Sequence, residues 1–396
     1  MASNQLDDAY SSHGRNFAEN LEVLSFRGLS DVRLDGLKQV NLLVGGNNSG
    51  KTSILEAIAV LYAGNDLRKW LDISFVREVR TFASSPAQMS VLDTISWMFP
   101  SHDVELFEHS GAGEISMSAQ TPVGRRGLRA TIDTFEGFLD ESDMIGAQRR
   151  LLRVGNERRH SDEPVSDNGI ELNIETSTPS EGLFPDEEKD TFQIWSQIGL
   201  RTMKKARSRE NVVQYIPPYG HRNSSSNITA LSRSIQEDNT TELNDLMSSL
   251  DSRISGVELV TSGNQHRPQI AIRLEDRKLV PVSVMGDGVR RALSIALSIL
   301  ASNRGILLID EVEAAFHVSA FSKIFDWMVL AAKKHQVQIF ATTHSLEAIE
   351  GIANSTESTH DLSAYLIGPE DGKVVKNYTG GMLQRLVVEA GLDIRF

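Results

Sequence analysis

The stretch 45–52 constrains this chain more than any other. It reads G-G-N-N-S-G-K-T and fits the pattern G-x-x-x-x-G-K-[ST] of a phosphate-binding loop. The apolar run at 39–44, Q-V-N-L-L-V, precedes it and is typical of a buried strand. The run at 52–62 follows, and its apolar residues recur at helical spacing. The chain therefore has the strand, loop and helix that a nucleotide-phosphate site needs.

The chemistry of this loop suggests a task for each residue type. Glycines let successive backbone N–H groups turn toward the phosphates, and the following helix points its positive end at them. We expect Lys51 to reach the β- and γ-phosphates and the hydroxyl of Thr52 to bind Mg²⁺. The residues expected to bind ATP in this loop are Gly45, Asn47, Asn48, Ser49, Gly50, Lys51, Thr52 and Ser53.

Two acids end a second apolar run, at 305–309. Asp310 is placed to bind Mg²⁺ directly or through water, and Glu311 to polarise the attacking water. A surface turn with two solvated acids is the alternative interpretation. The phosphate loop upstream and a crossover helix predicted at 316–332 favour the metal and base roles.

A histidine follows the strand predicted at 337–341. His344 stands in A-T-T-H-S, where its side chain could donate to the γ-phosphate and sense hydrolysis. A cluster of Thr and Ser that caps a helix, with an incidental histidine, is the alternative.

A glycine-rich turn begins the helix predicted at 287–301. Backbone N–H groups at such a start form an anion site, here at Gly286, Asp287 and Gly288. Because the Lys51 loop already holds the phosphates of its own subunit, a second anion site suggests the ATP of a second subunit. An ordinary turn that caps a helix is the alternative.

Composition narrows the class of protein. A chain of 396 residues could hold two or three domains, or one domain with a large insertion. The net charge of −13 requires that any nucleic acid be bound by a local patch, and the lack of cysteine excludes disulfides and thiolate metal sites and suits the cytoplasm. No apolar run approaches the roughly 18–20 residues of a membrane span. Residues 1–19 lack the apolar centre of a signal peptide, so we expect a flexible tail there and no membrane partner.

One local basic patch is present, at Arg201–Arg209. It contains Arg201, Lys204, Lys205, Arg207 and Arg209. Contact with the phosphates of DNA or RNA is one interpretation, and a solvated helix face is the other.

The pattern along the chain predicts four segments in an α/β fold. An alternating strand pattern begins at 20, and the nucleotide signals stop between 66 and 210, where a hairpin around 122–127 and a strand at 170–176 are expected. Polar, flexible stretches are expected at 157–168 and 177–190, and one helical stretch at 231–251. The predicted division is a flexible tail at 1–19, an ATPase N-terminal lobe with the phosphate loop at 20–65, an inserted antiparallel β/helical lobe at 66–210, and an ATPase C-terminal lobe at 211–396.

Four segments together resemble the RecF/SMC branch of ABC-type ATPases: G-G-N-N-S-G-K-T-S-I-L-E-A-I, M-G-D-G-V-R-R-A-L, I-L-L-I-D-E-V-E and A-T-T-H-S. The form N-N-S-G-K-T is particularly similar to the overcoming-lysogenization-defect (OLD) family and its stand-alone relatives in prokaryotic defence systems. The resemblance covers about 20–62 and 280–345. It implies a P-loop NTPase fold of ABC/RecF type with a mixed sheet, and hydrolysis of ATP to ADP and phosphate.

The resemblance also implies roles for single residues. It makes 45–52 the Walker A loop, Asp310 and Glu311 the Walker B pair, His344 the switch histidine, Gly286–Gly288 the signature loop acting across a dimer, and Glu313, Ala314 and Ala315 part of the D-loop region.

The chain departs from the family pattern at several points. Gly286 replaces the usual signature serine, so backbone N–H groups must serve and activation across the dimer is expected to be weak. Gln214 is the candidate for the Q-loop glutamine. A long heptad region, as in an SMC rod, is lacking. The short segment after His344 and the lack of D-x-D predict that the Toprim nuclease domain of full OLD proteins is missing.

Four functions compete. The first is an ATPase, a homodimer or higher even oligomer, that drives or gates a separate nuclease-like effector in anti-phage defence or DNA metabolism. The second is a DNA repair ATPase of RecF type, which DNA should stimulate. The third is the ATPase subunit of an ABC transporter, which the M-G-D-G form and the large insertion argue against. The fourth is a P-loop GTPase or small-molecule kinase, for which the guanine motif N-K-x-D is lacking.

Overall fold

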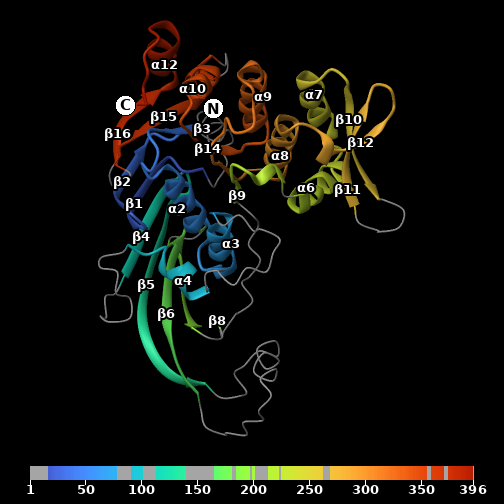
Figure 1. The fold of residues 1–396 in the computed structure, drawn as a ribbon. Helices are drawn as coiled ribbons and strands as arrows, with labels where there is room; N and C mark the ends of the chain where they lie inside the picture. The colour runs from blue at the N-terminus through green and yellow to red at the C-terminus, as the bar shows by residue number, and fades with distance from the viewer. Residues whose placement is uncertain are drawn as a thin grey trace, which may run out of the picture.

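The computed structural model describes residues 17–77, 91–100, 113–139, 165–180, 184–196, 199–200, 213–222, 224–261, 268–302, 304–354, 358–369 and 373–395. Its strands form sheets of seven, six and three strands. Figure 1 shows the six-stranded sheet between the other two, so this sheet forms the centre of the molecule.

The six-stranded sheet is mostly parallel. Its edge strand β16 runs antiparallel to β15, and the other pairs of neighbours are parallel. All residues of β3 and β13 are buried, because helices cover both faces of the sheet. In spatial order the strands are β16 (Val374–Thr379), β15 (Leu362–Ile367), β3 (Val40–Val44), β14 (Gln338–Thr343), β13 (Ile306–Ile309) and β9 (Val213–Ile216).

Different helices cover the two faces of this sheet. Leu43 and Leu308 pack in one core with α2 (Lys51–Ala63), whereas Leu42 and Ile309 pack on the other side with helices from the C-terminal half. The helices of that second face are α8 (Asp287–Ala301), α9 (Phe321–Lys334) and α10 (Leu346–Ala353). The short helices α11 (Ser358–Asp361) and α12 (Gly380–Leu383) and the π-helical turn Gln384–Glu389 complete the C-terminal part.

The seven-stranded sheet is antiparallel and extends away from the central sheet as a long blade (Figure 1). Its hairpin turns at Pro122 and Val123, where the sequence predicted a hairpin. In spatial order the strands are β2 (Leu29–Asp35), β1 (Asn20–Phe26), β4 (Gly113–Thr121), β5 (Gly124–Leu139), β6 (Val165–Thr178), β7 (Asp186–Trp195) and β8 (Gly199–Leu200). The blade therefore joins strands from the predicted N-terminal lobe and the predicted insertion into one sheet. The division into lobes stays a prediction.

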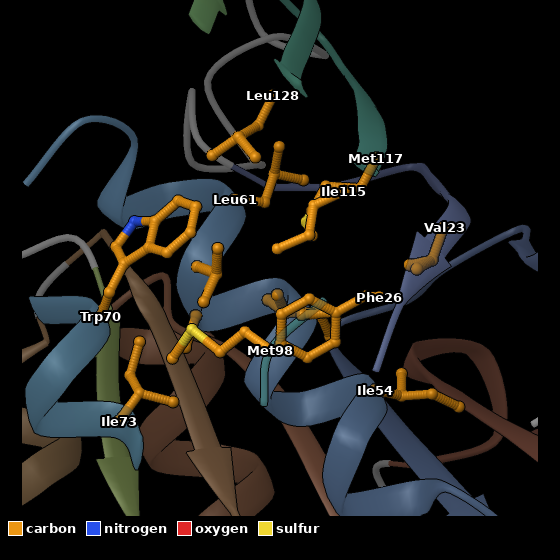
Figure 2. Close-up of a cluster of buried hydrophobic side chains, with 14 of the residues drawn as sticks. Val23, Phe26, Ile54, Leu61, Trp70, Ile73, Met98, Ile115, Met117 and Leu128 are labelled. Atoms are coloured by element: carbon orange, nitrogen blue, oxygen red, sulfur yellow. The ribbon is translucent and has the colours of Figure 1, made fainter. Parts of the chain in front are cut away.

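Helix α2 lies between the blade and the central sheet. Figure 2 shows its residues Ile54 and Leu61 among apolar side chains from the blade, from the neighbouring helix α3 (Leu67–Arg77) and from Met98, just after α4 (Val91–Ser96). A buried ion pair, Arg27–Glu56, joins α2 to the turn after β1 at 2.9 Å. The helix that starts at the phosphate loop is thus fixed on both sides.

A third core lies beyond α8 (Figure 1). The face of α8 that carries Leu293 and Leu297 packs against a three-stranded sheet and two helices, while Ile295 and Ile299 pack against the central sheet. The partners in this core are α6 (Ser224–Gln236), α7 (Thr240–Leu250), β10 (Ile254–Thr261), β11 (Pro268–Leu274) and β12 (Leu279–Pro281). Helix α8 therefore connects two cores.

Three sequence predictions were wrong in detail. Phe17 and Ala18, which the sequence assigned to a flexible tail, are buried, and the Ala18 N–H donates to Gln338 Oε1 at 2.9 Å. Residues 1–16 lie outside the described residues, and the tail there stays a prediction. The stretch 177–190, expected to be flexible, contains the start of β7, because its charges are paired across the strands, as in Lys189–Glu175. Similarly, β6 begins within the stretch 157–168, whose part before Val165 is not described.

The helical stretch expected at 231–251 is interrupted. Asp238 has φ 57°, a left-handed conformation that ends α6 before α7 begins. Within the described ranges, no helix combines the length and the apolarity needed to cross a bilayer.

The core around α2 makes a stability prediction. Trp70 is fully buried, and its Nε1 donates to the carbonyl of Gly64 at 2.8 Å. Trp70→Ala should lower the free energy of unfolding by about 3–5 kcal/mol, measured by urea denaturation. The control is Trp97→Ala, because Trp97 is 58% exposed and should change it by less than about 0.5 kcal/mol. Equal effects would contradict this description of the core.

Candidate nucleotide site

The phosphate loop connects β3 to α2, and its backbone requires glycine. Gly45 has φ 144°, and a Cβ placed there would lie 2.5 Å from the carbonyl oxygen of Ile367 at the end of β15. Gly50, with φ 89°, is the N-cap of α2, and no side chain in the described part of the chain caps this helix. The N–H groups of the first turn of α2 are therefore available to an anion.

Lys51 extends over this loop. Its Nζ donates to the carbonyls of Gly45 (3.0 Å) and Gly46 (2.5 Å) and lies 3.3 Å from Ser49 Oγ. Burial lowers the pKa of Lys51, and the nearby charges of Asp310, Glu313 and Glu311 oppose that shift. The loop thus carries a cation that faces a group of acids.

The carboxylate of Asp310 contacts three other side chains of the site. Thr52 Oγ1 lies 3.1 Å from both of its carboxylate oxygens, Thr342 Oγ1 donates at 2.6 Å, and Tyr215 OH lies at 3.4 Å. Its side chain follows β13, at the carboxyl end of the parallel strands, where such sheets bind ligands. Carboxylate and hydroxyl oxygens are the ligands that Mg²⁺ prefers, so Asp310 and Thr52 fit this ion.

Glu311 adopts an unusual backbone conformation. Its φ is 48°, and its N–H donates to Thr342 Oγ1 at 2.8 Å. Such a conformation costs on the order of 1 kcal/mol or more and is common at functional sites. Burial raises the pKa of Glu311, Asp310 raises it further, and His344 opposes the shift. A raised pKa makes this carboxylate a stronger base.

Arg291 is a component of the site for which the sequence predicted no role. Its side chain is fully buried on α8 and donates to the carbonyls of Pro217 (2.5 Å), Pro218 (3.2 Å), Asp310 (2.9 Å) and Glu311 (3.3 Å). Burial lowers its pKa to about 10, which still leaves it charged at neutral pH. The available signal was an arginine on the apolar face of a predicted helix.

His344 reaches the site from the end of β14. Its side chain is 54% exposed, and its Nδ1 lies 3.1 Å from Glu313 Oε1. The carbonyl of His344 accepts a hydrogen bond from Arg395 Nη1 at 2.9 Å. Glu313 was expected in the D-loop region and Arg395 had no expected role, because both contacts depend on distant parts of the chain.

Gly286, Asp287 and Gly288 form the start of α8, as predicted. Gly286 is the N-cap without a side-chain cap, and a Cβ there would meet no described atom within 4 Å. Gly288 is tighter, since its Cβ would lie 3.1 Å from the carbonyl oxygen of Ala315. Asp287 pairs with Arg290 at 3.0 Å, which offsets its charge at the helix start. The glycine turn thus lies beside the D-loop region of its own chain.

The structure does not bring Gln214 to the site. Its neighbours Tyr215 and Ile216 on β9 face opposite sides of the sheet, with Tyr215 toward Asp310 and Ile216 in the core with α8 and α9. Because strand side chains alternate, Gln214 faces the same way as Ile216, away from Asp310, so the Q-loop assignment was wrong. The basic patch Arg201–Arg209 lies outside the described residues.

Family models match both halves of this site. The model "AAA domain, putative AbiEii toxin, Type IV TA system" matches residues 209–350, and the model "AAA ATPase domain" matches residues 18–96. The RecF DNA replication and repair protein of Marinomonas is 50% identical over 48 residues, which are 12% of this chain and 13% of RecF. These matches support an ATPase of RecF/SMC type.

Longer matches to this ATPase are more distant. A protein of Helicobacter pylori named "ATP/GTP phosphatase" is 22% identical over 380 residues, which cover 92% of this chain and 96% of that protein. The SMC head domain from Thermotoga maritima aligns with 90% of this chain and 98% of its own, with 14% identity and a TM-score of 0.43.

The Lys51 side chain makes a first prediction for the site. Lys51→Ala should lower kcat for ATP hydrolysis by about two to three orders of magnitude, because it removes the cation over the loop. Phosphate release measures this, and thermal denaturation shows that the fold is kept. Lys333→Ala is the control, because that lysine is 57% exposed and belongs to α9. Turnover like the parent's in Lys51→Ala would refute the assignment.

The raised pKa of Glu311 makes a second prediction. A general base works only when ionised, so kcat should fall as the pH drops through this pKa, above the ordinary glutamate value of 4.5. The measurement is kcat against pH, with ATP binding followed over the same range to separate catalysis from affinity. A rate that persists down to the ordinary glutamate range would contradict the assignment of Glu311 as the base.

Proposed function

We propose that the protein binds ATP with Mg²⁺ and hydrolyses it as a homodimer, each ATP lying between the Lys51 loop of one subunit and the glycine turn of the other. The supporting observation is the start of α8. Gly286 is exposed, no described side chain caps the helix, and the N–H groups there suit an anion. The phosphates of the same subunit are already served by the Lys51 loop, so a second subunit's ATP is the ligand that this turn fits.

The residues divide the hydrolysis among them. Mg²⁺, held by Thr52 and Asp310, would neutralise charge on the phosphates. The N–H groups at the start of α2 and the Lys51 ammonium bind the phosphates, and Glu311 accepts a proton from the attacking water. His344 donates a hydrogen bond to the γ-phosphate. The bond between the β,γ-bridging oxygen and the γ-phosphorus breaks, and ADP and phosphate leave.

Dimerisation would depend on ATP. The γ-phosphate supplies contacts to the glycine turn that ADP lacks, so ATP favours the closed dimer. A two-fold arrangement gives two equivalent sites from one self-complementary surface. Because Gly286 has no hydroxyl, the partner would offer only backbone N–H groups to the γ-phosphate.

We further propose that the ATP cycle gates a separate, nuclease-like effector in prokaryotic defence or DNA metabolism. The N-N-S-G-K-T loop and the family description that names a type IV toxin–antitoxin protein support this role. A RecF-like ATPase that acts on DNA directly is the second candidate, supported by the match to RecF over 48 residues. Stimulation of ATP turnover by DNA, without a second protein, would favour the RecF-like function.

The dimer makes a prediction for two variants. Glu311→Gln should bind ATP but not hydrolyse it, and should accumulate as a dimer in light scattering only with ATP. Gly286→Arg should remain monomeric and inactive while it binds ATP normally, because φ −58° and the open surroundings tolerate a side chain within the subunit. This position suits the test better than Gly288, whose neighbour Ala315 is close.

Mixing the two variants is the sharper experiment. In the mixed dimer, the Gly286→Arg chain keeps its Glu311 and faces the partner's intact turn, so one site is complete. The mixture should recover turnover that neither variant shows alone. Gly286→Arg protein that is fully active as a monomer would refute the shared site.

A further inference from the structure

Glu313 lies two residues beyond Glu311, and the phosphate chemistry above leaves it without a task. Its Oε1 is 3.1 Å from His344 Nδ1 and accepts a second hydrogen bond, from the His344 backbone N–H, also at 3.1 Å. The Glu313 side chain is only 10% exposed, whereas that of His344 is 54% exposed. The buried carboxylate of Glu313 therefore holds Nδ1 of the His344 ring, and the rest of the ring extends toward solvent.

The second oxygen of Glu313 carries a cost in stability. Oε2 is buried and has no hydrogen-bond partner in the described part of the chain. A buried carboxylate oxygen without a partner costs free energy, which the two contacts of Oε1 with His344 must offset.

The contact determines how the imidazole is presented. An ionised carboxylate can only accept hydrogen bonds, so the ring nitrogen that faces it, Nδ1, carries a proton. Nε2 is then the nitrogen at the outer end of the ring. The bond from the backbone N–H to the same oxygen, together with Arg395 on the His344 carbonyl, limits movement of the loop that carries the ring.

We infer that Glu313 is the positioning residue for His344: it holds Nδ1–H and so fixes the direction of the ring, with Nε2 facing the γ-phosphate. Nε2 donates to that phosphate when the ring carries a proton on both nitrogens. The inference rests on the proposed role of His344. It differs from the D-loop expectation, because Glu313 acts within its own subunit.

A second explanation has to be separated from this one. The charge of Glu313 also reaches Lys51 and Glu311, where it raises the pKa of each group. Glu313 could therefore affect turnover by electrostatics alone. That effect would not need His344, and a double-mutant cycle distinguishes the two.

The cycle compares kcat and KM for ATP in the parent, Glu313→Ala, His344→Ala and the double variant. Glu313→Ala should lower kcat about ten- to a hundredfold, as loss of a partner that orients a functional histidine does, with little change in KM. In the His344→Ala background the same change should lower kcat by less than about twofold. Glu313→Gln keeps the shape and an acceptor for the backbone N–H, so it should retain part of the kcat and serves as the second variant if Glu313→Ala does not fold.

Glu347→Ala is the matched control. Glu347 is an exposed acid on the same segment that bonds to Ser345 Oγ at 2.8 Å, and its loss should leave kcat within about twofold of the parent. If His344→Ala keeps full kcat, the proposed role of His344 is wrong and the inference falls with it. If His344→Ala is impaired but Glu313→Ala lowers kcat by the same factor in both backgrounds, the inference is overturned and the proposed function stands.

Discussion

The carboxylate of Asp310 is the interaction on which the rest of the site depends. It accepts hydrogen bonds from the hydroxyl groups of Thr52 on α2, Thr342 on β14 and Tyr215 on β9. These residues are far apart in sequence and meet because β9, β13 and β14 are parallel and end at the same edge of the sheet. The burial of α2 between two sheets then fixes the position of Thr52 relative to that edge. The metal site is therefore a product of the sheet order and the packing of one helix.

Arg291 fixes the backbone that carries Asp310 and Glu311. Four carbonyls from two strand ends converge on one buried guanidinium, and one of them belongs to Glu311, whose left-handed backbone needs such support. Arg291 lies on α8, the helix that begins at the exposed glycine turn. In the proposed dimer, the N-terminus of α8 would contact the partner's ATP. One turn later, Arg291 on the same helix binds the backbone of Glu311, the proposed general base of its own subunit. Turnover in the two sites would then be coupled through a rigid element.

The sequence predicted the parts of the site that local patterns encode. The loop 45–52, the acids after β13 and the helix start at Gly286 are recognisable because each needs particular residues at fixed spacing. Contacts between distant residues were not predictable in this way. Glu313 meets His344 across 31 positions, and nothing in the segment M-G-D-G-V-R-R-A-L indicates that Arg291 would bind the carbonyls after two distant strands. The assignment of Gln214 failed because side chains alternate along a strand, and on β9 it is the neighbouring Tyr215 that lies toward Asp310. β7 was missed because its acids look like a solvated loop until their cross-strand partners are known.

The distribution of charge shows what a partner subunit would contribute. The charged groups of the site all come from one chain: the acids act on the pKa of Lys51, and Glu313 contacts His344. Gly286 offers only backbone N–H groups, and Asp287 beside it is paired with Arg290. Closure of the proposed dimer would thus add weak, directional donors and exclude water, while the acid, base and cation are already in place. In such an arrangement the partner subunit controls the timing of hydrolysis, whereas the chemistry is carried out by residues of one subunit. This suits an ATPase whose closed state signals to another protein.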